Sequence, residues 1–236
     1  MRRKIQVFGW TLIWSGIFIF GYLGWQLFGT GVVNAGVQEA AQENLRADFE
    51  QASVVPPVVE QIDPEAFLGG ERPDDPEVPD LVDFHPEEAP ERGKELAFLR
   101  IPKIDVDEVL FEGVDRETLK SGPGHMDGTP IPGQPGNAVV SGHRTTYGSP
   151  FFDFDLLEPG DRIEVETSIG EHIYQIREII VVKPTDVWVT DDRPGGWLTL
   201  TTCEPKFSAR QRLIVFAEMI SGPNLAFIEL HEQKFS

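Results

Sequence analysis

The sequence contains very little cysteine: Cys203 is the single cysteine among 236 residues. One thiol can form no intramolecular disulfide, so the folded part of the chain must be stabilised by an apolar core. No pair of possible ligands shows a metal-binding spacing, and the acidic residues form no recognisable calcium site. We therefore expect no metal and no other cofactor, and nothing in the sequence suggests a nucleic-acid partner.

Charged side chains are missing from most of the N-terminal region, residues 1–38, where only Arg2, Arg3 and Lys4 precede a long apolar stretch. At 1.5 Å per residue this stretch can cross a hydrocarbon core of about 30 Å, which predicts a single membrane-spanning helix. The positive-inside rule keeps the N-terminus in the cytoplasm and places the rest of the chain outside the cell. A cleaved signal peptide, with "VNA" at 33–35 as its cleavage site, is the alternative. The apolar stretch exceeds the ~7–15 residues of a signal-peptide core, which favours the uncleaved anchor.

Residues 39–95 are poor in apolar side chains and rich in negative charge. Seventeen Asp and Glu stand against four Lys and Arg, together with eight prolines. This composition predicts an extracellular linker that cannot bury enough apolar surface to offset chain entropy. Residues 37–52 are compatible with a short helix, whereas "VVPPVVEQIDPEAF" and "ERPDDPEVPD" are expected to break regular structure. As a flexible coil the linker would span about 40 Å and hold the following domain away from the bilayer.

From residue 96 onward the sequence alternates between apolar and polar residues in short segments, typical of β-strands. No helical pattern is long enough for a βαβ crossover, and only residues 116–122 and 149–157 are expected to form short helices. We therefore predict an all-β domain, a closed barrel, over residues 96–236. The predicted strands lie within residues 95–104, 107–113, 137–143, 161–167, 172–182, 196–203 and 211–220.

The cysteine lies at the end of one of these strands. Cys203 is followed by Glu204-Pro205, which stops the strand and places the thiol at a rim of the barrel. An inert, buried cysteine is one interpretation and a nucleophile is the other. A thiol with a pKa near 8.5 is only a few per cent ionised at neutral pH, so a nucleophilic role requires a histidine or a cation nearby.

The chain offers both partners at neighbouring strand ends. His143 follows a short apolar strand and a glycine, so it too is expected at a rim. Arg212 begins the strand after the loop "EPKFSARQ", which would let its strand lie beside that of Cys203; Arg210 is its competitor. A guanidinium beside the thiol can stabilise charge on a carbonyl oxygen. His125 lies in a Gly/Pro-rich turn, where it would shape a groove wall or touch a substrate.

The order of His143, the motif "TLTTC" and Arg212 resembles that of sortases, the cysteine transpeptidases of Gram-positive cell envelopes. The resemblance covers residues 96–220 and includes "GPGH", "PGNAVVSGHRTTYGSPF" and "TLTTCEPKFSARQRLIV". The segments "GHRTTYG" and "KFSARQRLIVFAEM" are most similar to class E sortases of high-GC Gram-positive bacteria. The resemblance implies an eight-stranded barrel with its site at one rim, in agreement with the strand pattern. The chain departs from the class pattern at Met126, where an aromatic residue is common, and at Glu204, where histidine is common.

The resemblance also implies a reaction. Cys203 would attack the threonine carbonyl of a Leu-Ala-X-Thr-Gly or Leu-Pro-X-Thr-Gly sorting signal, and His143 would protonate the departing glycine amine. Arg212 would hold the carbonyl oxygen or the substrate backbone. A peptidoglycan amine would then take the acyl group from the thioester. The implied partners are secreted proteins with a C-terminal sorting signal, the peptidoglycan precursor and the membrane.

Five further residues are candidates for contact with the substrate. His125 and Met126 belong to the "GPGH" turn, Tyr147 would line the groove, and Thr202 would orient the arginine or the substrate. The backbone N–H of Glu204 would contribute to an oxyanion hole. Tyr147 and Thr202 also have ordinary interpretations, as a packing aromatic and a strand threonine.

Several alternatives stay open at the level of function. A pilus-polymerising sortase would carry a lid before the barrel, and "IDPEAFL" at 62–68 only faintly resembles the Asp-Pro-aromatic lid motif. Other envelope enzymes fit less well, because His143 precedes Cys203 and no Ser-His-Gly-Cys box is present. A non-catalytic, membrane-tethered β-barrel that binds a partner is the alternative outside enzymes.

Overall fold

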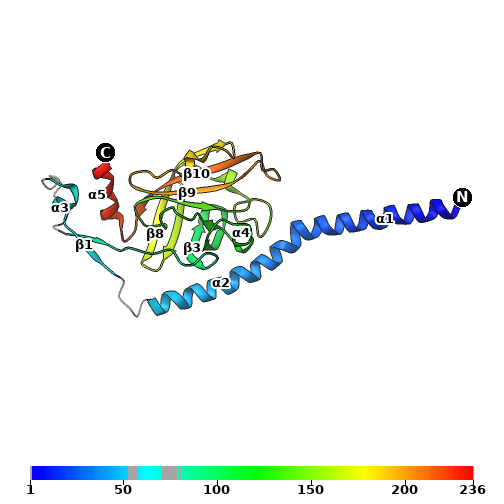
Figure 1. Ribbon diagram of the computed structural model, residues 1–236, viewed down its shortest axis with the longest axis horizontal. Coiled ribbons are helices and arrows are strands. Elements are labelled where there is room, and N and C mark those ends of the chain that lie inside the picture. The colour runs from blue at the N-terminus through cyan, green and yellow to red at the C-terminus, as the bar shows by residue number, and fades with distance from the viewer. Residues whose placement is uncertain (1, 53–57, 71–78, 80, 236) are drawn as a thin grey trace.

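An eight-stranded closed barrel forms the centre of the molecule in the computed structural model, which describes residues 2–52, 58–70, 79 and 81–235 (Figure 1). The strands follow one another around the barrel in the order β10-β8-β7-β3-β4-β5-β6-β9. All neighbouring pairs are antiparallel except β4 with β5 and β6 with β9. The predicted all-β closed barrel is thus confirmed. Its strands are β3 (Glu95–Ile101), β4 (Val106–Glu112), β5 (Gly124–His125), β6 (Gly136–Ser141), β7 (Arg162–Thr167), β8 (Gly170–Val182), β9 (Gly196–Glu204) and β10 (Gln211–Ser221).

Seven of the eight strands lie where the alternating pattern predicts them, and β5 is the one that the pattern misses. β5 is only two residues long, too short to show an alternation, and lies inside the "GPGH" turn. It pairs with β4 on one side and with β6 on the other, and so closes the barrel. The expected short helices appear as α4 (Thr118–Ser121) and as the single turn η3 (Phe154–Leu156).

The barrel interior holds the main apolar core. Alternate residues of each strand point inward, as Leu99 of β3, Leu110 of β4 and Leu200 of β9 do. The stacked rings of Phe151 and Phe154, 4.1 Å apart, add to this core from the connection between β6 and β7. Because the core occupies the inside, any reactive group accessible to a peptide must lie on the outer face or at a rim.

The N-terminal region is a long, bent helix that continues beyond the barrel (Figure 1). It consists of α1 (Arg2–Gly24), one π-helical turn η1 (Trp25–Gly29) and α2 (Thr30–Ala52). Within α1, the stretch Gln6–Gly24 is long and apolar enough to cross a bilayer by length and composition. These features are consistent with a membrane anchor.

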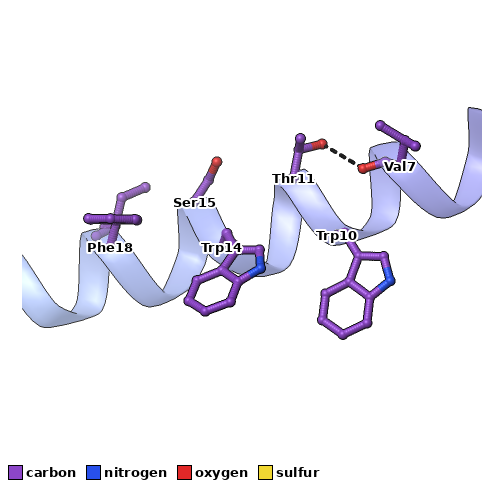
Figure 2. Close-up of a pocket in the computed structure, with 7 residues that line it drawn as sticks. Val7, Trp10, Thr11, Trp14, Ser15 and Phe18 are labelled. Carbon is purple, nitrogen blue, oxygen red and sulfur yellow. Dashed lines mark hydrogen bonds between the residues drawn. The ribbon is translucent and has the colours of Figure 1, made fainter.

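Most of the exposed side chains of α1 are apolar. Trp10 and Trp14 project from the same side of the helix (Figure 2). The hydroxyl of Thr11 donates a hydrogen bond of 3.1 Å to the carbonyl of Val7, so this polar group is satisfied within the helix, as a bilayer interior requires. The open space beside these side chains is lined by residues of α1.

The second half of the helix packs against the outside of the barrel. The buried residues of α2 follow a spacing of four, three and four along one face: Asn34, Gln38, Ala41 and Leu45. Ala41 and Leu45 contact an apolar patch on β3 and β4 formed by Phe98, Val109 and Phe111. The helix that the sequence allowed over residues 37–52 is thus present as part of α2, and its docking on the barrel means that residues 39–52 do not form a flexible spacer.

Part of the remaining predicted linker is also ordered. β1 (Glu60–Ile62) pairs with β2 (Val82–Phe84), and α3 (Pro64–Leu68) lies between them in sequence. The side chain of Asp63 caps α3 by accepting the N–H of Glu65 at 3.0 Å, and a proline at the first helical position suits this start. Regular structure therefore exists within "VVPPVVEQIDPEAF", where we expected none. Most of "ERPDDPEVPD" lies outside the described residues.

These elements pack on the C-terminal helix α5 (Leu225–Phe235), where Phe67 of α3 lies 5.3 Å from Phe227 between ring centroids. Ile228 of α5 packs against Gly196, at the start of β9. Through Ile228, α5 covers the end of the barrel at which β9 begins, and α3 packs on α5 from outside. Figure 1 shows α3 and α5 on the side opposite to α1.

Candidate active site

Cys203 and Arg212 are direct neighbours across two antiparallel strands. The register of β9 and β10 pairs Cys203 with Arg212, as expected, and directly paired residues point to the same face of a sheet. Leu200 and Leu213 point into the core, so alternation places the thiol and the guanidinium on the outer face. Arg210 precedes β10 and is exposed, so it holds no such position.

His143 extends from the strand on the other side of β9. β6 runs parallel to β9, and their last register pair joins Ser141 to Thr201. His143 and Cys203 each follow two residues later, so both lie at the same rim on strands about 4.8 Å apart. Beyond the last pair, Gly142 N–H donates to the Thr201 carbonyl at 3.1 Å. The histidine, the thiol and the arginine thus lie at the ends of three adjacent strands, with His143 two residues beyond β6.

Burial changes the protonation behaviour of His143. The ring of His143 lies 5.1 Å from the ring of Tyr147, and the two planes are tilted by 37°. Desolvation by burial lowers the pKa of His143 below its ordinary value, because the charged imidazolium loses solvent. The ring is therefore mainly neutral at neutral pH and able to accept a proton. Tyr147 is a packing partner of this ring, in line with its ordinary interpretation.

Arg144 is a residue of the site that the sequence did not single out. Its side chain is only 3% exposed although it is charged. The guanidinium donates to the carboxylate of Glu204, to the carbonyl of Cys203 at 3.2 Å, to the carbonyl of Phe152 at 3.3 Å and to Asp155 at 2.8 Å. It therefore joins the loop after His143 to the end of β9. The burial of a single arginine in a loop produces no periodic pattern in the sequence, so the sequence could not predict the position of Arg144.

A second polar cluster holds the connection between β8 and β9 on the same outer face. The turn η4 (Val187–Thr190) packs through Val189 against Phe216 of β10. The buried amide of Asn137 donates to the carbonyls of Val189 and Asp191 at 3.3 and 2.9 Å. It also accepts the hydroxyl of Thr199 at 2.7 Å. This connection thus covers the outer face of β10 around Phe216.

The other candidates take structural positions. Thr202 is buried and donates its hydroxyl to the Gly142 carbonyl at 2.8 Å, so it ties β9 to the end of β6, while the Arg212 guanidinium donates to the carbonyls of Ala209 and Gln211 at 3.1 and 3.0 Å. The Glu204 side chain, still within β9, is engaged by the buried arginine. In the described part of the chain, no group of three or more His, Cys, Asp or Glu side chains is arranged to hold a metal ion.

His125 lies inside the barrel wall and is 1% exposed. Its Nδ1 faces the carboxylate of Glu112 at 2.7 Å, and its Nε2 faces the carbonyl of Pro130 at 2.9 Å. These contacts favour the role of shaping a wall over direct contact with a substrate. Since neighbouring residues of an extended chain point to opposite sides, the half-buried Met126 lies on the outer face.

Several known proteins are similar to this chain. A family model described as the sortase domain matches residues 99–220, more than half of the chain. Sortase SrtE1 of Streptomyces coelicolor is 39% identical over 146 residues, which cover 55% of this chain and 42% of that protein. Sortase D of Bacillus subtilis is 34% identical over 137 residues, 56% of this chain and 67% of its own length. The chain therefore spans less than half of the first relative and about two thirds of the second.

A solved structure agrees with the barrel. The crystal structure of sortase E1 from Streptomyces coelicolor, with a tripeptide in its active site, is 37% identical to this chain. The match covers 57% of this chain and 92% of that one, with a TM-score of 0.52. The shared part is about the length of the barrel, and the region before it accounts for most of the remainder. Together with the family model, the barrel and the motifs at its rim, these matches show that the chain belongs to the sortase family.

Proposed function

We propose that this protein is a membrane-anchored cysteine transpeptidase that attaches secreted proteins to the cell wall. The observation that carries the proposal is the register that sets Cys203 opposite Arg212, with His143 at the end of the adjacent parallel strand. A nucleophile, a proton carrier and a fixed cation at one accessible rim suit acyl transfer. The relatives are cysteine transpeptidases, and the tripeptide in the crystal structure of sortase E1 supports a peptide substrate.

The first step forms a thioester. The Cys203 sulfur attacks the threonine carbonyl carbon of a Leu-Ala-X-Thr-Gly or Leu-Pro-X-Thr-Gly signal, and His143 takes the thiol proton. The lowered pKa of His143 favours this base role, because the ring is neutral before the reaction. Arg212 stabilises the negative charge that develops on the carbonyl oxygen, and the N–H of Glu204 assists it. When the C–N bond breaks, His143 returns the proton to the glycine amine.

The second step regenerates the thiol. An amine of a peptidoglycan precursor attacks the thioester carbonyl, His143 accepts its proton, the C–S bond breaks, and His143 returns the proton to the departing sulfur. Water in place of the amine gives hydrolysis. The partners we propose are therefore secreted proteins bearing a sorting signal and a peptidoglycan amine. The cluster Arg2, Arg3 and Lys4 supports a cytoplasmic N-terminus, with the barrel as an extracellular catalytic domain.

A role in wall anchoring is favoured over pilus polymerisation. The segment "IDPEAFL" forms α3 and packs on α5, which covers the start of β9. Cys203 lies seven residues further along β9, about 23 Å away at the rise of a strand. This segment therefore does not cover the candidate site as a lid would.

Mass spectrometry of the full-length protein in detergent tests the proposal. After incubation with a panel of sorting-signal peptides, we expect Cys203 to carry the fragment that ends in threonine, and hydroxylamine to release it. Cys203→Ala should show neither adduct nor cleavage while keeping its unfolding temperature, since a half-buried rim thiol contributes little packing. Cleavage by Cys203→Ala, or the absence of an adduct with every peptide, would contradict the proposal. The non-catalytic β-barrel that binds a partner would then be favoured.

Met126 is proposed to influence the second position of the signal. A thioether offers flexible apolar contact and no strong hydrogen-bond partner, so discrimination between alanine and proline should be modest, about tenfold or less. Met126→Tyr adds a hydroxyl that can pair with the substrate backbone. We expect it to raise the alanine-to-proline ratio of kcat/KM. An unchanged ratio would show that Met126 does not contact that position.

A further inference from the structure

The contacts of α2 reach beyond apolar packing, because two buried amides anchor it to the barrel. Gln38 is 6% exposed, donates to the carbonyls of Ser121 and Val109 at 2.8 and 3.2 Å, and accepts the N–H of Val109 at 2.6 Å. Its side chain therefore satisfies backbone groups of both β4 and α4. Bonds of this kind fix the rotation and the height of a helix, which apolar contacts alone do not.

Asn34, one turn earlier, connects α4 with the loop that follows His143. It is 4% exposed and donates to the carbonyls of Lys120 and Ser121, each at 2.9 Å. Its Oδ1 lies so close to Gly148 that a Cβ on that glycine would be 2.1 Å away. Gly148 also has a φ of +78°, which favours glycine. The loop and the helix therefore fit together only with glycine at this position.

A third contact brings α2 next to the ring that covers the histidine. The backbone N–H of Tyr147 points to the hydroxyl oxygen of Thr30 at 3.4 Å. Tyr147 has a φ of +51°, a conformation that a non-glycine residue adopts rarely without support. Its ring in turn lies 5.1 Å from that of His143. Tyr147 therefore contacts both Thr30 of α2 and the ring of His143.

We propose that α2 is a positioning element of the active site: Thr30 and Asn34 hold the turn at Tyr147 and Gly148, and this turn fixes the ring of His143. The inference rests on the proposed function for its catalytic meaning, but the positioning itself is a separate property. Thr30 is six residues beyond Gly24, where the apolar span ends, about 9 Å along a helix. The same contacts therefore hold the reactive rim close to the membrane surface.

The test uses the full-length protein in detergent micelles with 13C-labelled histidine, the His143 signal being assigned with His143→Gln. Asn34→Ala removes both hydrogen bonds to α4 and the contact with Gly148. We expect the His143 ring signal to shift, because its position relative to the ring of Tyr147 changes, and kcat to fall about tenfold with KM changed less than about twofold. Gly148→Ala should give the same pattern from the opposite side of the contact.

Asn44→Ala is the matched control, since Asn44 is an exposed asparagine of the same helix whose amide donates to the exposed side of the barrel, to Glu95 at 3.4 Å. It should leave both the signal and kcat unchanged. Asn34→Ala and Gly148→Ala that lower the unfolding temperature without moving the His143 signal or kcat would show that α2 only stabilises the fold, and would overturn the proposal. A shifted signal in a protein whose wild type cleaves no peptide would support the positioning and refute the proposed function.

Discussion

The arginine of the site can be distinguished from its neighbour by position alone. Arg212 lies opposite Cys203 on the outer face, whereas Arg210 is an exposed residue before β10. We expect Arg212→Ala to lower kcat/KM about 100-fold, the usual effect of removing a group that stabilises an oxyanion. Arg210→Ala should change it less than about threefold, because surface substitutions away from a site have small effects. Steady-state kinetics with one peptide compares them, and equal losses would contradict the role given to the register.

His172 makes stability depend on pH. It is fully buried on β8, and burial lowers its pKa from 6.5 to about 4. Because the unfolded chain binds the proton more tightly, the contribution of His172 is complete above pH 6.5 and is lost as the pH falls towards 4. The loss amounts to about 3 kcal/mol at most. Urea unfolding at pH 7.5 and 4.5 should show a smaller difference for His172→Gln than for wild type; an equal difference would assign the acid sensitivity elsewhere.

Between elements, Arg144 joins the connection after β6 to the end of β9, the two segments that carry His143 and Cys203. A lysine keeps the charge but lacks the planar fork that serves several acceptors. We expect Arg144→Lys to lower the free energy of unfolding by about 2 kcal/mol and also the rate of thioester formation. The matched control is Arg177→Lys, whose ion pair with Glu218 is exposed and should matter by less than about 0.5 kcal/mol. A rate equal to wild type in Arg144→Lys would limit this arginine to a role in stability.

For the whole molecule, we expect the docked α2 to set the height of the barrel above the bilayer in the proposed membrane-anchored enzyme. Seven helical residues inserted between Gly24 and Thr30 would raise it by about 10 Å while nearly keeping the docking face in register. In proteoliposomes we expect cleavage of a short-tethered membrane substrate to fall and cleavage of a soluble peptide to stay unchanged. The same insertion after Ala52 lies beyond the docked helix and should alter neither. Equal effects of both insertions would restore the view of residues 39–95 as a spacer.

The linker shows why composition misled at this scale. Charge and proline content describe an average over residues 39–95, whereas the apolar docking contacts of this range come from Ala41, Leu45 and Phe49, which pack against Phe98 and its neighbours on the barrel. A local signal did exist. The segment "LAFL" in β3 is apolar on both faces, and a strand buried on both sides must be covered from outside.

The sequence by itself determined seven of the eight strands and the positions of the three candidate residues at strand ends. Alternation is a local property, so seven strands were visible in it, and the order of His143, Cys203 and Arg212 already placed each at a strand end. Only the tertiary structure decided what depends on contacts between distant segments. The short strand β5, the buried Arg144 and the docking of Asn34 and Gln38 are of this kind. A polar residue looks like a surface residue in a sequence, because its burial depends on partners that only the fold brings within hydrogen-bond distance.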